Sequence, residues 1–277
     1  MFLISNFKKR LKAKFHKIFL ERFEYIYKNI HNQNVTINLS RPIPNIVYQT
    51  WVNESLPWRM LKGVQIFREN NKDFSFILYN HNERDNYMLE SWGSRKIYQI
   101  YKNSVFHSSK ADIWRYCILY EKGGYYFDIK SSCEIPISKL KVSRGASISY
   151  EPHSTFIPPS LEIFKNNKNI GLNVILNWAF GFKKNHPLLK IQIENIEKYS
   201  EFFKGKTFEN PKASILAFTG PGMLTKSYRD YLKIYKKKII ANGIDFNGRG
   251  IYEIPGSQYR YKQSINYSKV KNSKILI

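Results

Sequence analysis

Short apolar runs alternate along the chain with segments whose apolar residues recur every three or four positions. The runs indicate buried strands, and the segments of helical period indicate amphipathic helices. Because strands that alternate with helices pair in parallel through right-handed crossovers, we expect an α/β sandwich around a mostly parallel central sheet. Strands are expected at residues 45–51, 74–79, 125–129, 145–150 and 213–222, a further apolar core element at 172–182, and helices at 58–70, 83–91, 95–102, 108–120, 191–199 and 223–231.

Residues 1–31 follow a different pattern, with a continuous apolar stripe at helical spacing and with lysine and arginine on the opposite face. This pattern predicts an amphipathic basic helix, followed by a polar linker, so that residues 1–40 precede a single domain over residues 41–277. Two environments suit the helix: the interface of an anionic membrane, or a packing surface on the domain or on a partner helix. The aromatic character of the stripe favours the membrane.

The stretch at residues 108–136 gathers most of the candidate chemistry. Asp112 and Arg115 are three residues apart on an expected helix, hence on one face, and the glycine pair at 123–124 ends that helix. The next strand delivers Asp128 at its carboxyl end, where α/β sheets collect their ligands. Taken singly, these features suit a surface ion pair, a helix stop and a turn. Their fixed order over some twenty residues favours a functional site.

The composition narrows the class of protein. With 277 residues and a net charge of +24, the chain suits one basic α/β domain attracted to polyanions, such as nucleic acid, an anionic membrane or a phosphorylated substrate. Cys117 and Cys133 belong to no CxxC or Cys/His cluster, so neither a zinc site nor a disulfide is indicated. No stretch approaches the length of a membrane span or of a secretory segment. We expect a cytoplasmic protein, with residues 1–31 as the candidate for attachment to the inner face of the cytoplasmic membrane.

The order Lys110, Asp112, Arg115, Gly123-Gly124 and Asp128 resembles the sugar-binding region of the glycosyltransferases with an Asp-x-Asp motif, family 32. The resemblance implies a GT-A-like nucleotide-sugar-binding fold and a catalytic group made of Asp112, Arg115 and Asp128, which would hold the sugar or the ribose. It assigns donor contacts to Gln49, Thr50 and Trp51 beside the base, to Lys110, Gly123, Gly124 and Lys130, and to Thr219 and Gly220 in a Thr-Gly-Pro turn.

Lys130 departs from the family pattern. It stands where the family usually places the Asp that holds a divalent metal on the diphosphate, which leaves Asp128 as the motif carboxylate for Mn or Mg. Because an ammonium repels a divalent cation and can itself neutralise a diphosphate, we expect a metal requirement that is weak or absent. In the alternative, Lys130 points away, and Glu134 or a C-terminal residue supplies the missing ligand.

The resemblance implies a hexosyltransferase that uses a UDP- or GDP-linked sugar, with retention. The acceptor would be a capsular polysaccharide, a lipopolysaccharide or a related glycan, free or lipid-linked. A second class is a non-catalytic basic protein that binds sugars or nucleic acid. The joint presence of Asp112, Arg115 and Asp128 favours the enzyme, and without a nucleic-acid motif we expect no nucleic-acid partner. His186, directly before Pro187, is expected to be structural.

Overall fold

The computed structural model describes residues 27–152, 173–251, 253–255, 257 and 267–277. Most of the predicted N-terminal helix falls on residues 1–26, which lie outside the described residues. A five-stranded sheet with the order β4-β2-β5-β8-β7 forms the centre of the molecule. Its strands are β2 (Ile46–Thr50), β4 (Ser75–Tyr79), β5 (Gly124–Phe127), β7 (Ala146–Ser147) and β8 (Ala179–Phe182).

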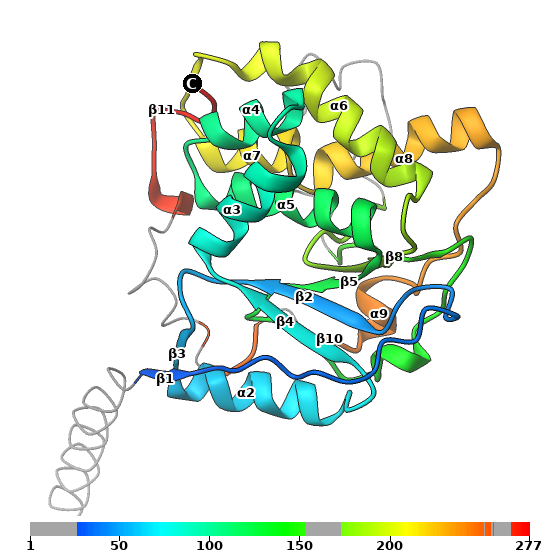
Figure 1. Ribbon diagram of the computed structural model, residues 1–277. Coiled ribbons are helices and arrows are strands. Elements are labelled where there is room, and N and C mark those ends of the chain that lie inside the picture. Colours follow the sequence, from blue (N-terminus) through cyan, green and yellow to red (C-terminus); the bar gives the residue numbers. More distant parts are fainter. Residues whose placement is uncertain (1–26, 153–172, 252, 256, 258–266) are drawn as a thin grey trace, which may run out of the picture.

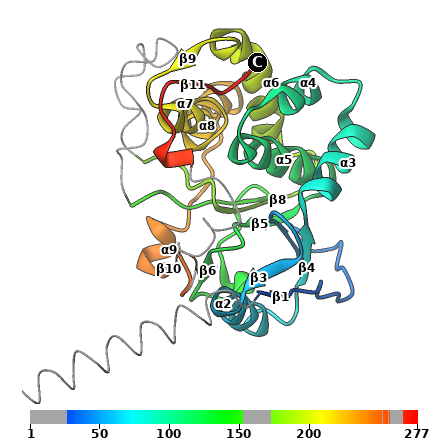
Figure 2. The same cartoon turned by 90° about the vertical axis from the view of Figure 1, so that its left-hand side faces the viewer.

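Helices cover both faces of this sheet (Figures 1 and 2), with α2 on one face and the layer from α3 to α8 on the other. The helices are α2 (Trp58–Glu69), α3 (His81–Trp92), α4 (Lys96–Asn103), α5 (His107–Lys122), α6 (Pro187–Phe203), α7 (Pro211–Phe218), α8 (Pro221–Tyr235) and the short turn α9 (Asp245–Gly248). Short strands pair outside the main sheet: β1 (Tyr27–Asn29) with β3 (Ser55–Pro57), β6 (Ser132–Cys133) with β10 (Gly250–Ile251), and β9 (Thr207–Phe208) with β11 (Ser273–Lys274).

The side chains of β5 alternate between two hydrophobic cores. Tyr126 packs in the core beneath the large helical layer, whereas Tyr125 and Phe127 pack in the core that includes Phe67 of α2. All four residues of β5 are buried, because helices close both faces of the sheet. A strand in this position directs the residue at its carboxyl end to the edge of the sheet.

The expected parallel arrangement is present in one half of the sheet. β2 pairs in parallel with β4 and with β5, so the carboxyl ends of these three strands meet at one edge. β8 runs antiparallel to both β5 and β7, which makes the complete sheet mixed. The large helical layer and this edge together position the site.

One predicted strand, at residues 213–222, is wrong, because α7 occupies Pro211–Phe218 and α8 begins at Pro221. The local sequence explains the helix. The side chain of Asn210 accepts a hydrogen bond from the backbone N–H of Ala213, and Pro211 follows at the first helical position, where its missing N–H costs nothing. A short apolar run by itself does not separate a buried strand from a buried helix.

The boundary predicted near residue 40 is also corrected. Tyr27–Asn29 forms a strand instead of the end of a helix, and Ile30, which follows it, is buried. The expected linker packs along the outer strand β4, where Gln33 and Phe76 exchange backbone hydrogen bonds. Residues 32–35 thus cover a sheet edge that would otherwise expose unpaired backbone groups.

Candidate active site

The site is built where α5 passes the carboxyl end of β5. Asp112 and Arg115 lie on one face of α5, and Asp128 follows β5 directly. Asp112 and Arg115 are buried, at 6% and 5% exposure, and the side chain of Asp128 is 18% exposed. The structure thus brings together the three residues that the sequence predicts as catalytic.

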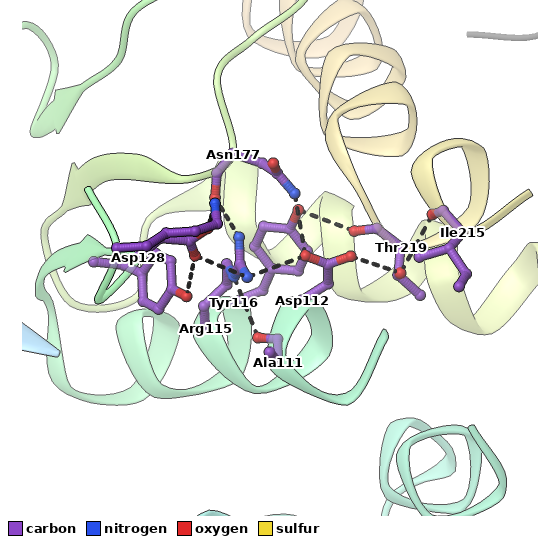
Figure 3. A network of polar contacts seen from close by, with 10 residues as sticks. Ala111, Asp112, Arg115, Tyr116, Asp128, Asn177, Ile215 and Thr219 are labelled. Carbon is purple, nitrogen blue, oxygen red and sulfur yellow. Dashed lines mark hydrogen bonds and ion pairs between the residues drawn. The ribbon is translucent and has the colours of Figure 1, made fainter. Parts of the chain in front are cut away.

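Arg115 lies between the two carboxylates (Figure 3). Its Nη2 is 3.2 Å from Asp112 Oδ1 and 3.4 Å from Asp128 Oδ1. Its Nε donates to the carbonyl oxygen of Ala111 at 3.2 Å, and its Nη1 donates to the carbonyl oxygen of Asn177. Because four protein acceptors hold the guanidinium, Arg115 sets the relative orientation of the two carboxylates.

Asp112 connects α5 to the start of α8. Its Oδ2 accepts a hydrogen bond from Thr219 Oγ1 at 2.9 Å, and its Oδ1 accepts one from Asn177 Nδ2 at 3.1 Å. The hydroxyl of Tyr116, one turn further along α5, donates to the carbonyl oxygen of Thr219 at 3.0 Å. Thr219, predicted from the Thr-Gly-Pro turn, is thus part of the network drawn in Figure 3.

Asp128 is held by a second set of donors. Its Oδ1 accepts a hydrogen bond from the hydroxyl of Tyr126, whose ring lies 4.2 Å from the guanidinium carbon of Arg115. Its Oδ2 is 2.9 Å from Lys130 Nζ. Lys130 therefore points toward the motif carboxylate and into the site. The alternative in which it turns away does not match this geometry.

The two carboxyl groups have opposite electrostatic environments. Burial raises the pKa of Asp112 to about 6, although the charge of Arg115 opposes the shift. Burial also acts to raise the pKa of Asp128, but Lys130 and Arg115 outweigh it and hold that pKa below its ordinary value. Asp128 is therefore ionised throughout the neutral range, whereas Asp112 gains a proton just below it.

A divalent metal does not fit this donor set. Mn and Mg prefer several oxygen ligands, including carboxylates that are free to bind. Asp128 already faces Arg115 and Lys130, and the described ranges contain no cluster of three or more His, Cys, Asp or Glu side chains suited to a metal. Two cations of the protein thus occupy the positions around Asp128 that a metal would need.

The residues predicted to contact the base lie at the carboxyl end of β2. Gln49 is fully buried, and its Oε1 accepts a hydrogen bond from Arg68 Nη2 at 3.0 Å, so it supports the strand from inside. Thr50 is also buried, and within the described part of the chain its hydroxyl has no hydrogen-bond partner. Trp51 is partly exposed at the edge and packs against a small core beneath it. Trp51 is thus the most accessible of the three.

Two predicted donor-binding residues, both glycines, have structural positions instead. Gly123 and Gly124 lie at the opposite end of β5 from Asp128, with φ values of 69° and 116°, and Cβ atoms there would approach Lys184 N and Ile46 O to 2.7 and 2.9 Å. They are needed for the turn. Lys110 places its Nζ 5.3 Å from the ring centroid of Tyr101 in α4, and its contact with a donor stays a prediction.

Gly220 is a close neighbour of the site. It is the N-cap of α8 and directly follows Thr219. A Cβ atom there would lie 2.9 Å from the Cα of Leu216, so a larger residue would displace the turn that holds the Thr219 hydroxyl against Asp112.

Sequence reasoning assigned no site role to two polar residues of this region. Asn177 bridges Asp112 and Arg115, and its segment, residues 172–182, resembles a family segment in which a core element presents an Asn. Burial raises the pKa of Glu151 to about 7, with Asp245 adding to the shift and Lys130 opposing it. Glu151 thus supplies a carboxyl group able to exchange a proton near neutral pH.

His186 has the structural role expected for it. Its Nδ1 accepts a hydrogen bond from the backbone N–H of Leu188 at 3.1 Å and so caps α6, and Pro187 occupies the first helical position.

Comparison with known proteins finds similarity to glycosyltransferases. Residues 57–145 match the family model described as the glycosyltransferase sugar-binding region containing DXD motif. The chain is 22% identical over 208 residues to inositol phosphoceramide mannosyltransferase 3 of Schizosaccharomyces pombe, covering 74% of this chain and 50% of that protein. It is 25% identical over 213 residues to the initiation-specific alpha-1,6-mannosyltransferase of Candida albicans, covering 70% of this chain and 54% of the relative. The chain thus spans about half the length of the curated relatives it matches.

The fold has a counterpart among solved structures. The PaToxG glycosyltransferase superposes with a TM-score of 0.50 and 14% sequence identity, covering 83% of this chain and 81% of that one. At this identity the likeness concerns the fold alone. In sequence, the chain is similar to glycosyltransferases with the DXD-containing sugar-binding region, as expected for a family 32-like protein. Its fold is a GT-A-like α/β architecture.

Proposed function

We propose that the chain is a hexosyltransferase that moves a sugar from a nucleotide-diphosphate donor to a glycan or lipid-linked glycan acceptor, with retention. The observation that carries the proposal is the Asp112–Arg115–Asp128 group at the carboxyl edge of the parallel strands. Ligands of α/β folds bind at this edge. Asp128, ionised and partly exposed, is suited to accept hydrogen bonds from sugar or ribose hydroxyls.

Arg115 and Asp112 take different roles in this mechanism. Arg115 is engaged by protein acceptors on both carboxylates, so it acts as a positioning residue that holds Asp128 in place. Asp112 holds Thr219 and Asn177 and thereby orders the turn at the start of α8. A preorganised polar site of this kind lowers the barrier because little reorganisation remains when charge separates between the sugar and the leaving diphosphate.

Lys130 is assigned to the diphosphate. Its ammonium lies at the carboxylate where the family places a metal, and a lysine is a good point charge for a phosphate. In this proposal, Lys130 moves from Asp128 to the phosphate oxygens when the donor binds. The reaction then has a weak metal requirement or none.

The relatives favour mannose as the transferred hexose, because those named above are mannosyltransferases. The acceptor chemistry is open between a polysaccharide of the capsular or lipopolysaccharide kind and a lipid-linked glycan. Such acceptors suit an enzyme at the inner face of the cytoplasmic membrane, with residues 1–26 as a candidate attachment segment.

A thermal-shift screen with UDP, GDP, CMP and their sugars, with and without Mn, tests the donor class. We expect one nucleoside diphosphate and its sugar to raise the Tm, and slow hydrolysis of that sugar to release the free nucleotide. If no nucleotide shifts the Tm and no donor is hydrolysed, the transferase proposal fails and a non-catalytic basic binding protein replaces it.

A further inference from the structure

The end of α8 carries exposed apolar side chains among lysines. Ile234 and Tyr235, in the last turn of the helix, are 64% and 43% exposed, and Ile240, in the loop that follows, is 56% exposed. We refer to residues 233–240 as the basic corner. Its exposed lysines are Lys233, Lys236, Lys237 and Lys238.

The fold holds these apolar side chains outward. Lys236 ends α8 in the left-handed conformation, with φ at 52°, and turns the chain back along the helix. Ile239 is then fully buried, and its backbone N–H and carbonyl oxygen both bond the hydroxyl of Tyr228. Because Ile239 is anchored inside, its neighbour Ile240 projects to the surface.

Basic residues from a second segment lie beside the basic corner. The side chain of Asn242 bonds both backbone groups of Lys141, and Arg144 is close enough to Tyr231 to lower its pKa against the raising effect of burial. Lys141 and Arg144 are both exposed. Neither residues 231–244 nor residues 136–147 contain an acidic side chain. The charged side chains of these two segments are therefore all basic, and Asp230, one turn before Ile234 on α8, is paired with Lys226.

We propose that the basic corner docks on an anionic lipid bilayer. The lysines would meet the lipid phosphates, and Ile234, Tyr235 and Ile240 would enter the interfacial region. A soluble polyanion would need only the lysines for binding. The exposed apolar side chains favour a bilayer, because its interfacial region can bury them. None of the described helices is long and apolar enough to cross a membrane.

This placement gives the site a defined distance from the lipid. α8 begins beside Asp112, through the hydrogen bond of Thr219, and its 15 residues span about 22 Å to the basic corner. A bilayer at the basic corner would lie within reach of a bound acceptor that carries a lipid. The inference does not depend on the proposed transfer.

Sedimentation with vesicles tests the charges first. The full chain is mixed with vesicles of phosphatidylcholine and phosphatidylglycerol, or of phosphatidylcholine alone. The variant Lys236→Gln/Lys237→Gln/Lys238→Gln should bind the anionic vesicles on the order of a hundredfold more weakly, at about fivefold per lysine. The matched variant Lys28→Gln/Lys62→Gln/Lys72→Gln, whose lysines are exposed in β1, in α2 and just after α2, should change binding much less.

The apolar residues are tested separately with Ile234→Ser/Ile240→Ser. Both side chains are exposed, so folding should be unaffected, whereas vesicle binding should fall at least tenfold. The control Leu39→Ser/Ile66→Ser removes side chains that are 80% and 51% exposed elsewhere and should bind like wild type.

Each other outcome overturns the proposal. Unchanged binding of both variants of the basic corner would assign any membrane attachment to another part of the chain. Loss in the lysine variant alone would indicate a soluble polyanion as partner. Donor hydrolysis, measured without vesicles, should be equal in all four variants, so failure of the docking proposal is distinguishable from failure of the transferase proposal.

Discussion

Two buried polar networks meet α8 at different points, one at its start and one at its middle. The first contains Asp112, Arg115 and Asp128 and meets the start of α8 at Thr219. The second joins α6 to the middle of α8, where Asn195 Nδ2 is 2.9 Å from Ser227 Oγ and 3.0 Å from Asp230 Oδ2. Both bury polar side chains, so burial alone does not separate a functional site from a structural one.

The difference lies in which elements supply the charges. The α6–α8 network has a single ion pair, Lys226 with Asp230, between residues four apart on one helix. The other network brings charges from α5 and from the end of β5 to the carboxyl edge of the sheet, and it moves the pKa values of Asp112 and Asp128 in opposite directions. Opposed shifts of this kind are typical of functional sites.

Replacing the carboxylates should have the largest effect. Asp128→Asn and Asp112→Asn keep the shape and remove the charge, and each should lower donor turnover by about 10² to 10³, comparable to the loss of one preorganised polar group in other enzymes. Release of free nucleoside diphosphate measures the turnover, and circular dichroism checks the fold. Near wild-type turnover in both variants would mean that this network is as structural as the other.

Lys130→Asp should change the metal dependence. We expect wild-type turnover to persist in excess chelator, because the ammonium supplies the positive charge. The variant places a second carboxylate near Asp128 and should become dependent on added Mn. Complete loss of wild-type turnover on chelation would contradict the role proposed for Lys130.

The pH dependence sharpens the difference between the two carboxyl groups. If ionised Asp112 is required, kcat/KM should fall as the pH drops through about 6, where this group gains its proton. The hydrogen bond from Asn177 lowers that pKa, so Asn177→Ala should move the acid limb to higher pH, by less than about one unit.

Protonation of Asp112 should increase the stability of the fold, whereas it should decrease activity. The folded pKa of Asp112 lies above its ordinary value of 3.8, so the folded state binds the proton more tightly. The contribution of Asp112 to the free energy of unfolding therefore rises as the pH falls from about 6 toward 3.8, while activity declines. If the acid limb of kcat/KM does not move in Asn177→Ala, Asp112 is not the group whose protonation sets the pH dependence of activity.

The smallest effect on activity should come from the α6–α8 network. Asn195→Leu removes the donor to Ser227 Oγ and one of the two donors to Asp230 Oδ2, leaving Lys226 as the other, so it should lower the free energy of unfolding by about 1–3 kcal/mol, measured by urea denaturation. Donor turnover should stay within about twofold of wild type, because none of these residues contacts the carboxylates. A loss of turnover as large as that of Asp128→Asn would show that the α6–α8 network also contributes to activity, contrary to this prediction.

Local sequence sufficed for the core of the site. The i,i+3 spacing of Asp112 and Arg115 places them on one helix face, and the glycine turn leads directly into a strand that ends at Asp128. These residues lie within seventeen positions of one another, so short-range geometry determines their approach. The α/β class and the family resemblance follow from the same kind of local pattern.

Only the tertiary structure decided the rest. Thr219 and Asn177 reach Asp112 across 107 and 65 residues, and no periodicity reports such a contact. Gly123 and Gly124 are the converse case: they are close to Asp128 in sequence but lie at the other end of β5. A strand separates its two ends in space while keeping them near in sequence, and packing of distant segments fills the space around each end. Neighbours along the chain therefore determined which elements form, and burial against remote elements decided which side chains share the site.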